Sequence, residues 1–255
     1  MNSIKKLLIF IIIIITMFAI FIVNGMVENI FVNDKIREFT ERGMFVLQEG
    51  NISYYKVKKA HDYEDTTRHI VDTYNDQKPG AKADIFVTSR NPIYSSVTLG
   101  YLSRLTWIGH SGLVIDDEGK ETIEITGNMT SEENVVQLWD NTWVYEDSPG
   151  IKTPQIALLR LKNTTEEQRN NIVSYANSKI GYKYNYTFLF NRNKSFYCSD
   201  LISRSVSAAG INVNYDYLAT TGSDMLVSDE TYIIYYKETT VENNVQKHKI
   251  YYLEG

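Results

Sequence analysis

The chain is poor in cysteine, proline and positive charge. Its 255 residues include a single cysteine, Cys198, which excludes a disulfide within the chain and a zinc site built from several cysteines. The four prolines and fourteen glycines form no low-complexity linker. Lys and Arg number 26 against 31 Asp and Glu, and the net charge of -5 argues against a broad nucleic-acid-binding surface. We therefore expect no nucleic-acid partner.

The composition is that of a folded protein. Hydrophobic residues form 43% of the chain and aromatic residues 13%, which suits one domain of ordinary size with appendages. The segment His61–His69 gathers two histidines and three carboxylates. Its histidines are eight residues apart and lack the close spacing typical of a metal site, so we interpret the segment as solvated helix surface. We expect no metal and no other cofactor.

A long stretch without charge lies near the N-terminus. Lys5 and Lys6 precede the 17-residue run Leu7–Val23, which is long for a signal-peptide core and just long enough to span a bilayer. No small-residue cleavage site follows, so a signal anchor is favoured, and a cleaved signal of a secreted protein is the alternative. The positive-inside tendency places Lys5 and Lys6 in the cytoplasm and the remainder outside the cell membrane.

These observations divide the chain into three parts. Residues 1–25 form the signal anchor or transmembrane helix, and residues 26–78 form a polar, membrane-proximal region whose apolar positions suit one or two helices. The folded domain, residues 79–255, begins at the turn signal Lys78-Pro79-Gly80. The oligomeric state is not indicated by any pattern.

Short strand-like segments in the third part predict an antiparallel sheet packed against helices, an α+β fold. Residues 84–88 read as a buried strand, and residues 107–115 and 121–126 flank an acidic, glycine-containing turn and predict a β-hairpin. His110 opens the first strand of this hairpin and Glu124 lies near the end of the second, so their side chains can face each other. Further strands are predicted at residues 134–138, 155–161, 231–237 and 249–253.

Two helices are predicted in the C-terminal half. The capping box Thr165-Glu-Glu-Gln168 begins the first, which ends before Gly181. The second begins near Cys198, has a small, mostly apolar face and ends at Gly210, where a left-handed cap is expected.

Cys198 is the candidate nucleophile because of its place at the front of this second helix. Free backbone N–H groups and the positive end of the helix dipole lower the pKa of a thiol there. A cysteine nucleophile also needs a base and a polar group that orients the base, and His110 and Glu124 have the required chemistry. The alternative is that Cys198 is a buried structural residue, which is common for free cysteines.

Aromatic residues lead up to Cys198. The loop Tyr182–Phe188 either forms a wall of a substrate cleft or fills the space beside the helix. Tyr197, Tyr184 and Trp107 are the candidate substrate-binding residues.

Four segments of the sequence resemble the NlpC-type papain-like hydrolases. They are Ala83-Asp-Ile-Phe-Val, His110-Ser-Gly-Leu-Val-Ile, Gly181-Tyr-Lys-Tyr-Asn and Tyr197-Cys-Ser-Asp-Leu-Ile. The chain order of histidine, glutamate and cysteine resembles the circularly permuted branch, the YiiX-like and YycO-like proteins, which are related to lecithin:retinol acyltransferases. The resemblance covers roughly Pro79 to Lys237 and implies a helix that presents the cysteine against an antiparallel sheet that presents the histidine. Ala83 departs from the glycine that is usual before Asp84.

The resemblance also implies roles for individual residues. Cys198 is the nucleophile, His110 the general base and acid, and Glu124 the polar third group, with Glu121 as its alternative. The backbone N–H of Cys198 is an oxyanion donor, and Tyr197 lines that pocket.

The implied activity is that of a cysteine peptidase or amidase. Outside a bacterial membrane the amide-rich polymer is peptidoglycan, so its stem peptides are the expected substrate. A lipid or lipid-linked acyl hydrolase or acyltransferase, and an inactive binding module of the same fold, are the alternatives.

Overall fold

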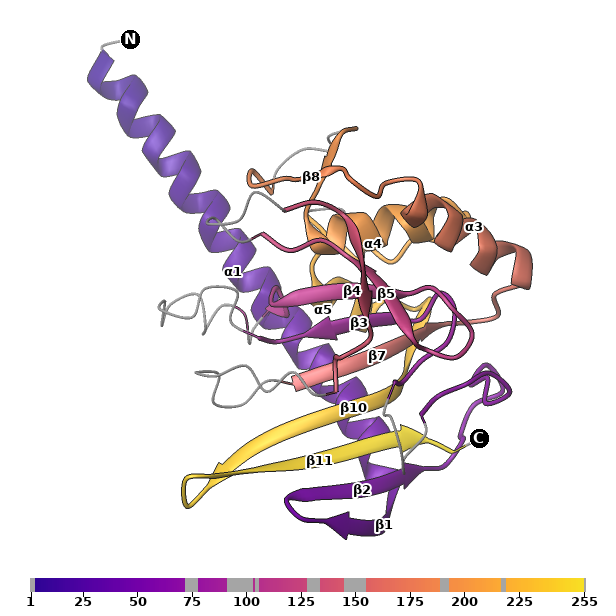
Figure 1. Ribbon diagram of the computed structural model, residues 1–255. Helices are drawn as coiled ribbons and strands as arrows, with labels where there is room; N and C mark the ends of the chain where they lie inside the picture. Colours follow the sequence, from indigo (N-terminus) through magenta and orange to yellow (C-terminus); the bar gives the residue numbers. More distant parts are fainter. Residues whose placement is uncertain are drawn as a thin grey trace.

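A computed structural model gives the fold of this chain (Figure 1). It describes residues 3–71, 78–90, 103, 106–127, 134–144, 155–188, 193–216 and 219–254. The helices are α1 (Ser3–Glu41), α3 (Glu166–Asn177), α4 (Cys198–Ser207) and α5 (Gly222–Val227). The strands are β1 (Gly43–Glu49), β2 (Ile52–Val57), β3 (Ile85–Thr88), β4 (His110–Val114), β5 (Glu121–Glu124), β6 (Gln137–Asp140), β7 (Gln155–Leu161), β8 (Lys183–Tyr184), β9 (Ser195–Phe196), β10 (Thr231–Glu242) and β11 (Val245–Leu253).

Nine strands form one sheet in the order β1-β2-β11-β10-β7-β3-β4-β5-β6, and β8 and β9 form a separate pair. Neighbours in the large sheet are antiparallel except β2 and β11, which are parallel. Helix α4 packs on β4, α3 packs on α4, and α5 contacts both α1 and β10. The predicted α+β fold, with an antiparallel sheet against helices and an apolar N-terminal helix, is therefore confirmed.

Local sequence signals account for helices α3 and α4. Thr165 and Gln168 form the predicted capping box of α3, with reciprocal side-chain hydrogen bonds to backbone N–H groups. The polypeptide leaves α4 through Gly210, whose φ of 78° lies in the left-handed region that glycine tolerates. One face of α4 is buried, as its small and apolar residues predicted.

The prediction that residues 26–78 are helical is wrong beyond Glu41. Residues 43–57 form the hairpin β1–β2, which turns at Gly50 with a φ of 56° and adds to the edge of the large sheet by pairing with β11. Isoleucine, valine and tyrosine favour strands in this segment, and a distant partner strand completes the pairing. The segment His61–His69 is also not helical, and residues 72–77 lie outside the described residues. The boundary at residue 79 stays a prediction.

A buried ion pair joins the centre of the sheet to the segment after β2. Arg160 of β7 and Asp84 are both fully buried, and Arg160 Nη2 donates to Asp84 Oδ2 at 2.7 Å. The same guanidinium donates to the backbone carbonyls of Asp65 (2.7 Å) and His69 (2.6 Å). Residues of the supposed helix surface are therefore held against the sheet by a core arginine.

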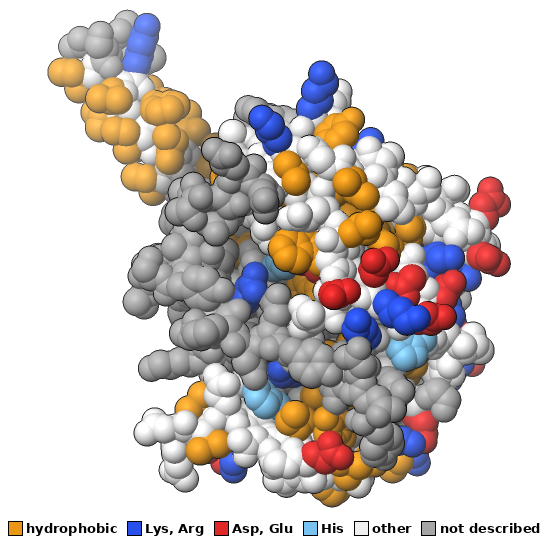
Figure 2. Space-filling model, viewed as in Figure 1, with side chains coloured by type: hydrophobic (Ala, Val, Ile, Leu, Met, Phe, Trp, Pro, Cys, Tyr) orange, Lys and Arg blue, Asp and Glu red, His pale blue; other side chains and the backbone are white. Residues whose placement is uncertain are grey.

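Helix α1 has two parts with different surroundings. Its N-terminal part protrudes from the domain and is covered by hydrophobic side chains (Figure 2). An 18-residue window there has a mean hydropathy of 3.1 and is not buried at all, so the helix is long and apolar enough to cross a membrane. In the C-terminal part, Val32, Ile36 and Phe39 are buried, and this part packs on α5 and β10.

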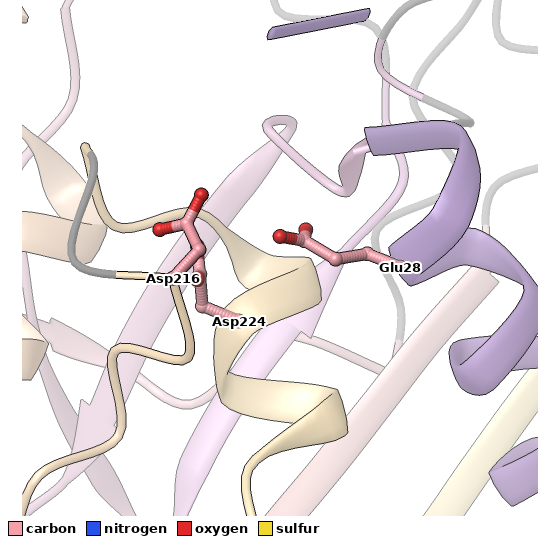
Figure 3. Close-up of side chains that lie close together, drawn as sticks. All are labelled: Glu28, Asp216 and Asp224. Carbon is pink, nitrogen blue, oxygen red and sulfur yellow. The ribbon is translucent and has the colours of Figure 1, made fainter. Parts of the chain in front are cut away.

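Three carboxylates meet where α1 joins the domain (Figure 3). Oxygen atoms of Glu28, Asp216 and Asp224 lie within 4.8 Å of one another. Asn24 Nδ2 donates to Glu28 Oε1 at 2.6 Å and to Asp216 Oδ2 at 2.8 Å. Burial, together with the negative charges of Asp224 and Asp216, raises the pKa of Glu28 to about 7.

We predict that the contact of Glu28 with Asp216 and Asp224, which joins α1 to the domain, is more stable in mild acid than in mild base. Because the folded pKa of Glu28 is raised from 4.5 to about 7, its contribution is complete below pH 4.5 and is lost as the pH rises through 7. The thermal midpoint of the chain in detergent should fall between pH 5 and pH 8, and Glu28→Gln should reduce this fall. Glu41→Gln, exposed on the same helix, is the control. An identical fall in Glu28→Gln and the unaltered chain would contradict the prediction.

Candidate active site

The β4–β5 hairpin brings His110 and Glu124 together. The register pairs Gly112 with Glu124, and His110 Nε2 lies 2.6 Å from Glu124 Oε2. Both side chains are buried, with 5% and 8% of their surface exposed. Glu121 is exposed at the other end of β5, so the structure brings Glu124 to the histidine, and not its alternative.

Trp143 contacts both residues of this pair, and it was not identified from the sequence. Its Nε1 donates to Glu124 Oε1 at 2.6 Å, and its ring stacks on His110 with centroids 5.3 Å apart and an interplanar angle of 2°. The Thr122 hydroxyl donates to the same Glu124 oxygen at 2.5 Å. Gly112 makes room for these groups, because a Cβ atom there would lie 3.0 Å from Glu124 Cγ and 3.1 Å from Trp143 Cζ2.

Cys198 is the first residue of α4 and faces this hairpin. Tyr197 has extended backbone angles at the N-cap, so the N–H of Cys198 is among the first of the helix, which lack partners within it. The Ser199 hydroxyl fixes the turn by donating to the Thr220 carbonyl at 2.7 Å. Cys198 is partly exposed, and its thiol hydrogen-bonds the ring of His110. Because Nε2 of that ring is hydrogen-bonded to Glu124, Nδ1 is the ring nitrogen that can hydrogen-bond the Cys198 sulfur.

The charges of these groups are coupled. Burial opposes the imidazolium, but hydrogen bonds to Cys198 and Glu124 and their negative charges outweigh it and raise the pKa of His110 to about 9. Burial likewise opposes the thiolate, but the hydrogen bond and charge of His110 hold the pKa of Cys198 below its ordinary value. The pKa of Glu124 is lowered despite burial, because His110, Thr122 and Trp143 stabilise its charge. The arrangement favours a thiolate–imidazolium pair.

Ser111 is a second residue that the sequence did not single out. It is 1% exposed, and its hydroxyl has no hydrogen-bond partner among the described residues. This hydroxyl lowers the pKa of the Cys198 thiol, as expected for a group that is placed to donate to the thiolate once the thiol has lost its proton. No sequence pattern predicts that the serine after His110 acts on the Cys198 thiol.

The aromatic residues before Cys198 form a contiguous cluster. The Tyr184 ring contacts the rings of Tyr186 (centroids 4.9 Å apart) and Phe188 (6.0 Å), and Phe188 contacts Tyr197 (5.7 Å). The structure therefore brings Tyr184 and Tyr197, two of the predicted substrate-binding residues, to the side of the cysteine.

Trp107, the third predicted substrate-binding residue, is 1% exposed. Its backbone has a φ of 50°, and its carbonyl oxygen would lie 2.4 Å from a Cβ atom at Gly222. Trp107 thus packs in the interior against the start of α5.

Comparison with known proteins places these observations in a family. No curated protein matches the chain. The crystal structure of the metalloprotein YiiX from Escherichia coli O157:H7 matches with a TM-score of 0.45 and 14% identity, over 60% of this chain and 96% of that chain. The family model of the permuted papain-like amidases, YaeF/YiiX, the C92 family, matches residues 82–251. The resemblance seen in the sequence is thereby confirmed, and the chain belongs to this family of permuted papain-like amidases.

Proposed function

We propose that the protein is a membrane-anchored, extracytoplasmic cysteine hydrolase that cleaves amide bonds with Cys198, His110 and Glu124. The observation that supports this proposal is the hydrogen-bonded series from the Cys198 thiol through the His110 ring to the Glu124 carboxylate. Residues 1–25 act as the anchor, and residues 79–255 carry the chemistry. No step requires a cofactor.

In the proposed reaction the Cys198 thiolate attacks the carbonyl carbon of the amide. The oxyanion that forms accepts a hydrogen bond from the backbone N–H of Cys198. His110 gives its proton to the leaving amine as the C–N bond breaks, which leaves a thioester and a neutral imidazole. The imidazole then takes a proton from water as the water oxygen attacks the thioester, and the C–S bond breaks to release the carboxylic acid and restore the thiolate–imidazolium pair.

The proposed substrates are the stem peptides of peptidoglycan, since an anchor would hold the domain beside the wall. The second candidate is a lipid or lipid-linked acyl substrate, and the exposed aromatic rings of Tyr186 and Phe188 beside Cys198 favour it. An inactive module of the same fold is the third.

Product analysis separates these candidates. The full-length chain in detergent is incubated with peptidoglycan and, separately, with phospholipid, and the products are identified by mass spectrometry. Amide cleavage gives new peptide termini, whereas lipid cleavage gives freed acyl chains. Because Cys198 is the single cysteine, protein alkylated with iodoacetamide is the matched control. Equal product from alkylated and unmodified protein on every substrate would exclude the cysteine mechanism.

We predict that kcat/KM has an alkaline limb at about pH 9. Above the pKa of His110 the ring loses the proton that it gives to the leaving amine. Glu124→Gln removes a negative charge that raises this pKa, so the limb should move to lower pH and the rate should fall about 100-fold. Glu121→Gln, exposed on the same strand, should leave the limb in place. A limb unmoved by Glu124→Gln would show that the carboxylate does not act on His110.

A further inference from the structure

The chain between α3 and α4 differs in charge from the rest of the molecule. From Gln168 to Ser199, 32 residues contain no Asp or Glu but five Lys or Arg, in a protein of net charge -5. Eight of these residues are Phe or Tyr. Positive charge and aromatic rings are therefore concentrated in the segment that ends at Cys198.

The structure gathers much of this segment on one surface. Lys183 of β8 pairs with Ser195 of β9, which places Lys194 beside it, and Ile180, Tyr186 and Phe188 are 45%, 46% and 50% exposed. We call this the basic aromatic surface, and it consists of Lys179, Ile180, Lys183, Tyr186, Phe188 and Lys194. Hydrophobic and lysine side chains lie together there, on the upper edge of the domain (Figure 2).

The basic aromatic surface lies at the end of the domain from which α1 projects. Figure 1 shows β8 on the same side as the N-terminal half of α1. A series of contacts leads from this surface toward α1, because the Phe188 ring contacts the Tyr197 ring, and Tyr197 hydrogen-bonds the backbone of Thr220. Four residues further on, Asp224 lies within 4.8 Å of Asp216, which accepts a hydrogen bond from Asn24 at 2.8 Å. Asn24 is the first residue after the uncharged run, so this series of contacts connects the cysteine end of α4 to the point where that run ends.

Aromatic and basic side chains have a known place in bilayers. Tyrosine and other amphipathic rings collect at the lipid headgroups, and lysines near the surface are attracted to anionic lipids, each by about fivefold in affinity. An apolar contact alone would suit a protein partner as well, but the lack of any acidic residue over this segment favours an anionic surface.

We infer that the basic aromatic surface rests on the anionic lipid headgroups of the membrane that holds α1, so that Cys198 works at the lipid–water boundary. This inference rests on the anchoring proposed above. It implies that the acyl substrate is presented at the membrane surface, and not deep in the wall. An anionic wall polymer is the competing partner for the same lysines.

The single cysteine allows a direct test in the full-length chain. In a Cys198→Ser background, one new cysteine is labelled with an environment-sensitive fluorophore, and the protein is reconstituted into phosphatidylcholine vesicles with or without phosphatidylglycerol. Phe188→Cys and Ile180→Cys report on the basic aromatic surface, Ile12→Cys on the anchor, and Val245→Cys on the distant β10–β11 turn. Val245 is 44% exposed and so matches Ile180.

The inference predicts blue-shifted emission and quenching by doxyl lipids at Phe188→Cys and Ile180→Cys in the anionic vesicles, and neither change at Val245→Cys. Lys183→Glu combined with Lys194→Glu should reverse the shift, whereas Lys247→Glu combined with Lys249→Glu should not. Lipid quenching at Ile12→Cys without any change at residues 180 and 188 would overturn the inference and leave the anchor intact, and it would favour the wall polymer. Absence of quenching at Ile12→Cys would overturn the anchoring itself.

Discussion

Cys198→Ala is expected to abolish hydrolysis, with a loss in kcat of about a million-fold. In the proposed mechanism the thiolate forms the covalent bond to the substrate, and His110 transfers protons but forms no bond to the carbonyl carbon in its place. Removal of a nucleophile costs about as much as removal of the whole catalytic group, because the remaining residues have no bond to make. The measurement is kcat on the substrate identified by product analysis.

Two controls make this result specific to the sulfur. Ser207→Ala lies on the exposed end of the same helix and should keep full activity. The thermal midpoint of Cys198→Ala should stay near that of the unaltered chain, since the side chain is small and partly exposed. Residual activity of Cys198→Ala within tenfold of the unaltered chain would mean that another group attacks the substrate.

Arg160→Met is expected to have the largest effect on stability, about 3–5 kcal/mol. The substitution removes the bidentate partner of the fully buried Asp84, which keeps a single ion-pair contact with Arg68 at 3.1 Å. It also frees the carbonyls of Asp65 and His69. A buried charge whose partner is removed costs several kcal/mol, whereas the intact pair contributes little beyond a hydrophobic replacement. For a domain of this size the melting temperature should fall by roughly 10 °C.

The matched control is Arg37→Met. Arg37 has 65% of its side chain exposed and pairs with Asp34 at 2.7 Å, and an exposed pair of this kind contributes about 1 kcal/mol or less. Equal melting temperatures for Arg160→Met and Arg37→Met would show that the core ion pair does not hold the segment after β2 to the sheet.

Local patterns predicted the parts of the candidate site that are local in the chain. The turn at residues 116–120 sets the register of the β4–β5 hairpin, so His110 and Glu124 could be paired from their positions alone. The helix signals after residue 198 placed Cys198 at a helix start. What joins these two pieces is the packing of α4 on β4, which the family resemblance implied and no local pattern contains.

The residues that were missed depend on distant contacts. Trp143 reaches Glu124 because the Asn141 side chain donates to the carbonyls of Pro79 (2.9 Å) and Gly119 (2.7 Å) and fixes the bend after β6. The strands at residues 43–57 need β11, almost 200 residues later, as their partner. Such pairings leave no periodic signal that separates them from an amphipathic helix.

One departure from the family has a local explanation. Ala83, where glycine is usual, has a φ of 70°, a backbone conformation that glycine adopts without strain and alanine does not. Its N–H still donates to the Val114 carbonyl at 2.9 Å. The bend before β3 is thus kept, and Asp84 reaches Arg160 as described.

The rate at which iodoacetamide alkylates Cys198, measured from pH 5 to pH 10, tests the central claim most directly, because the chain has no other thiol. A thiolate–imidazolium pair predicts that the rate levels off well below the ordinary thiol pKa of about 8.5, and that His110→Ala lowers the rate at pH 7 roughly tenfold. A rate that titrates near pH 8.5 in both proteins, or a thiol that does not react at all, would contradict the pairing of Cys198 with His110.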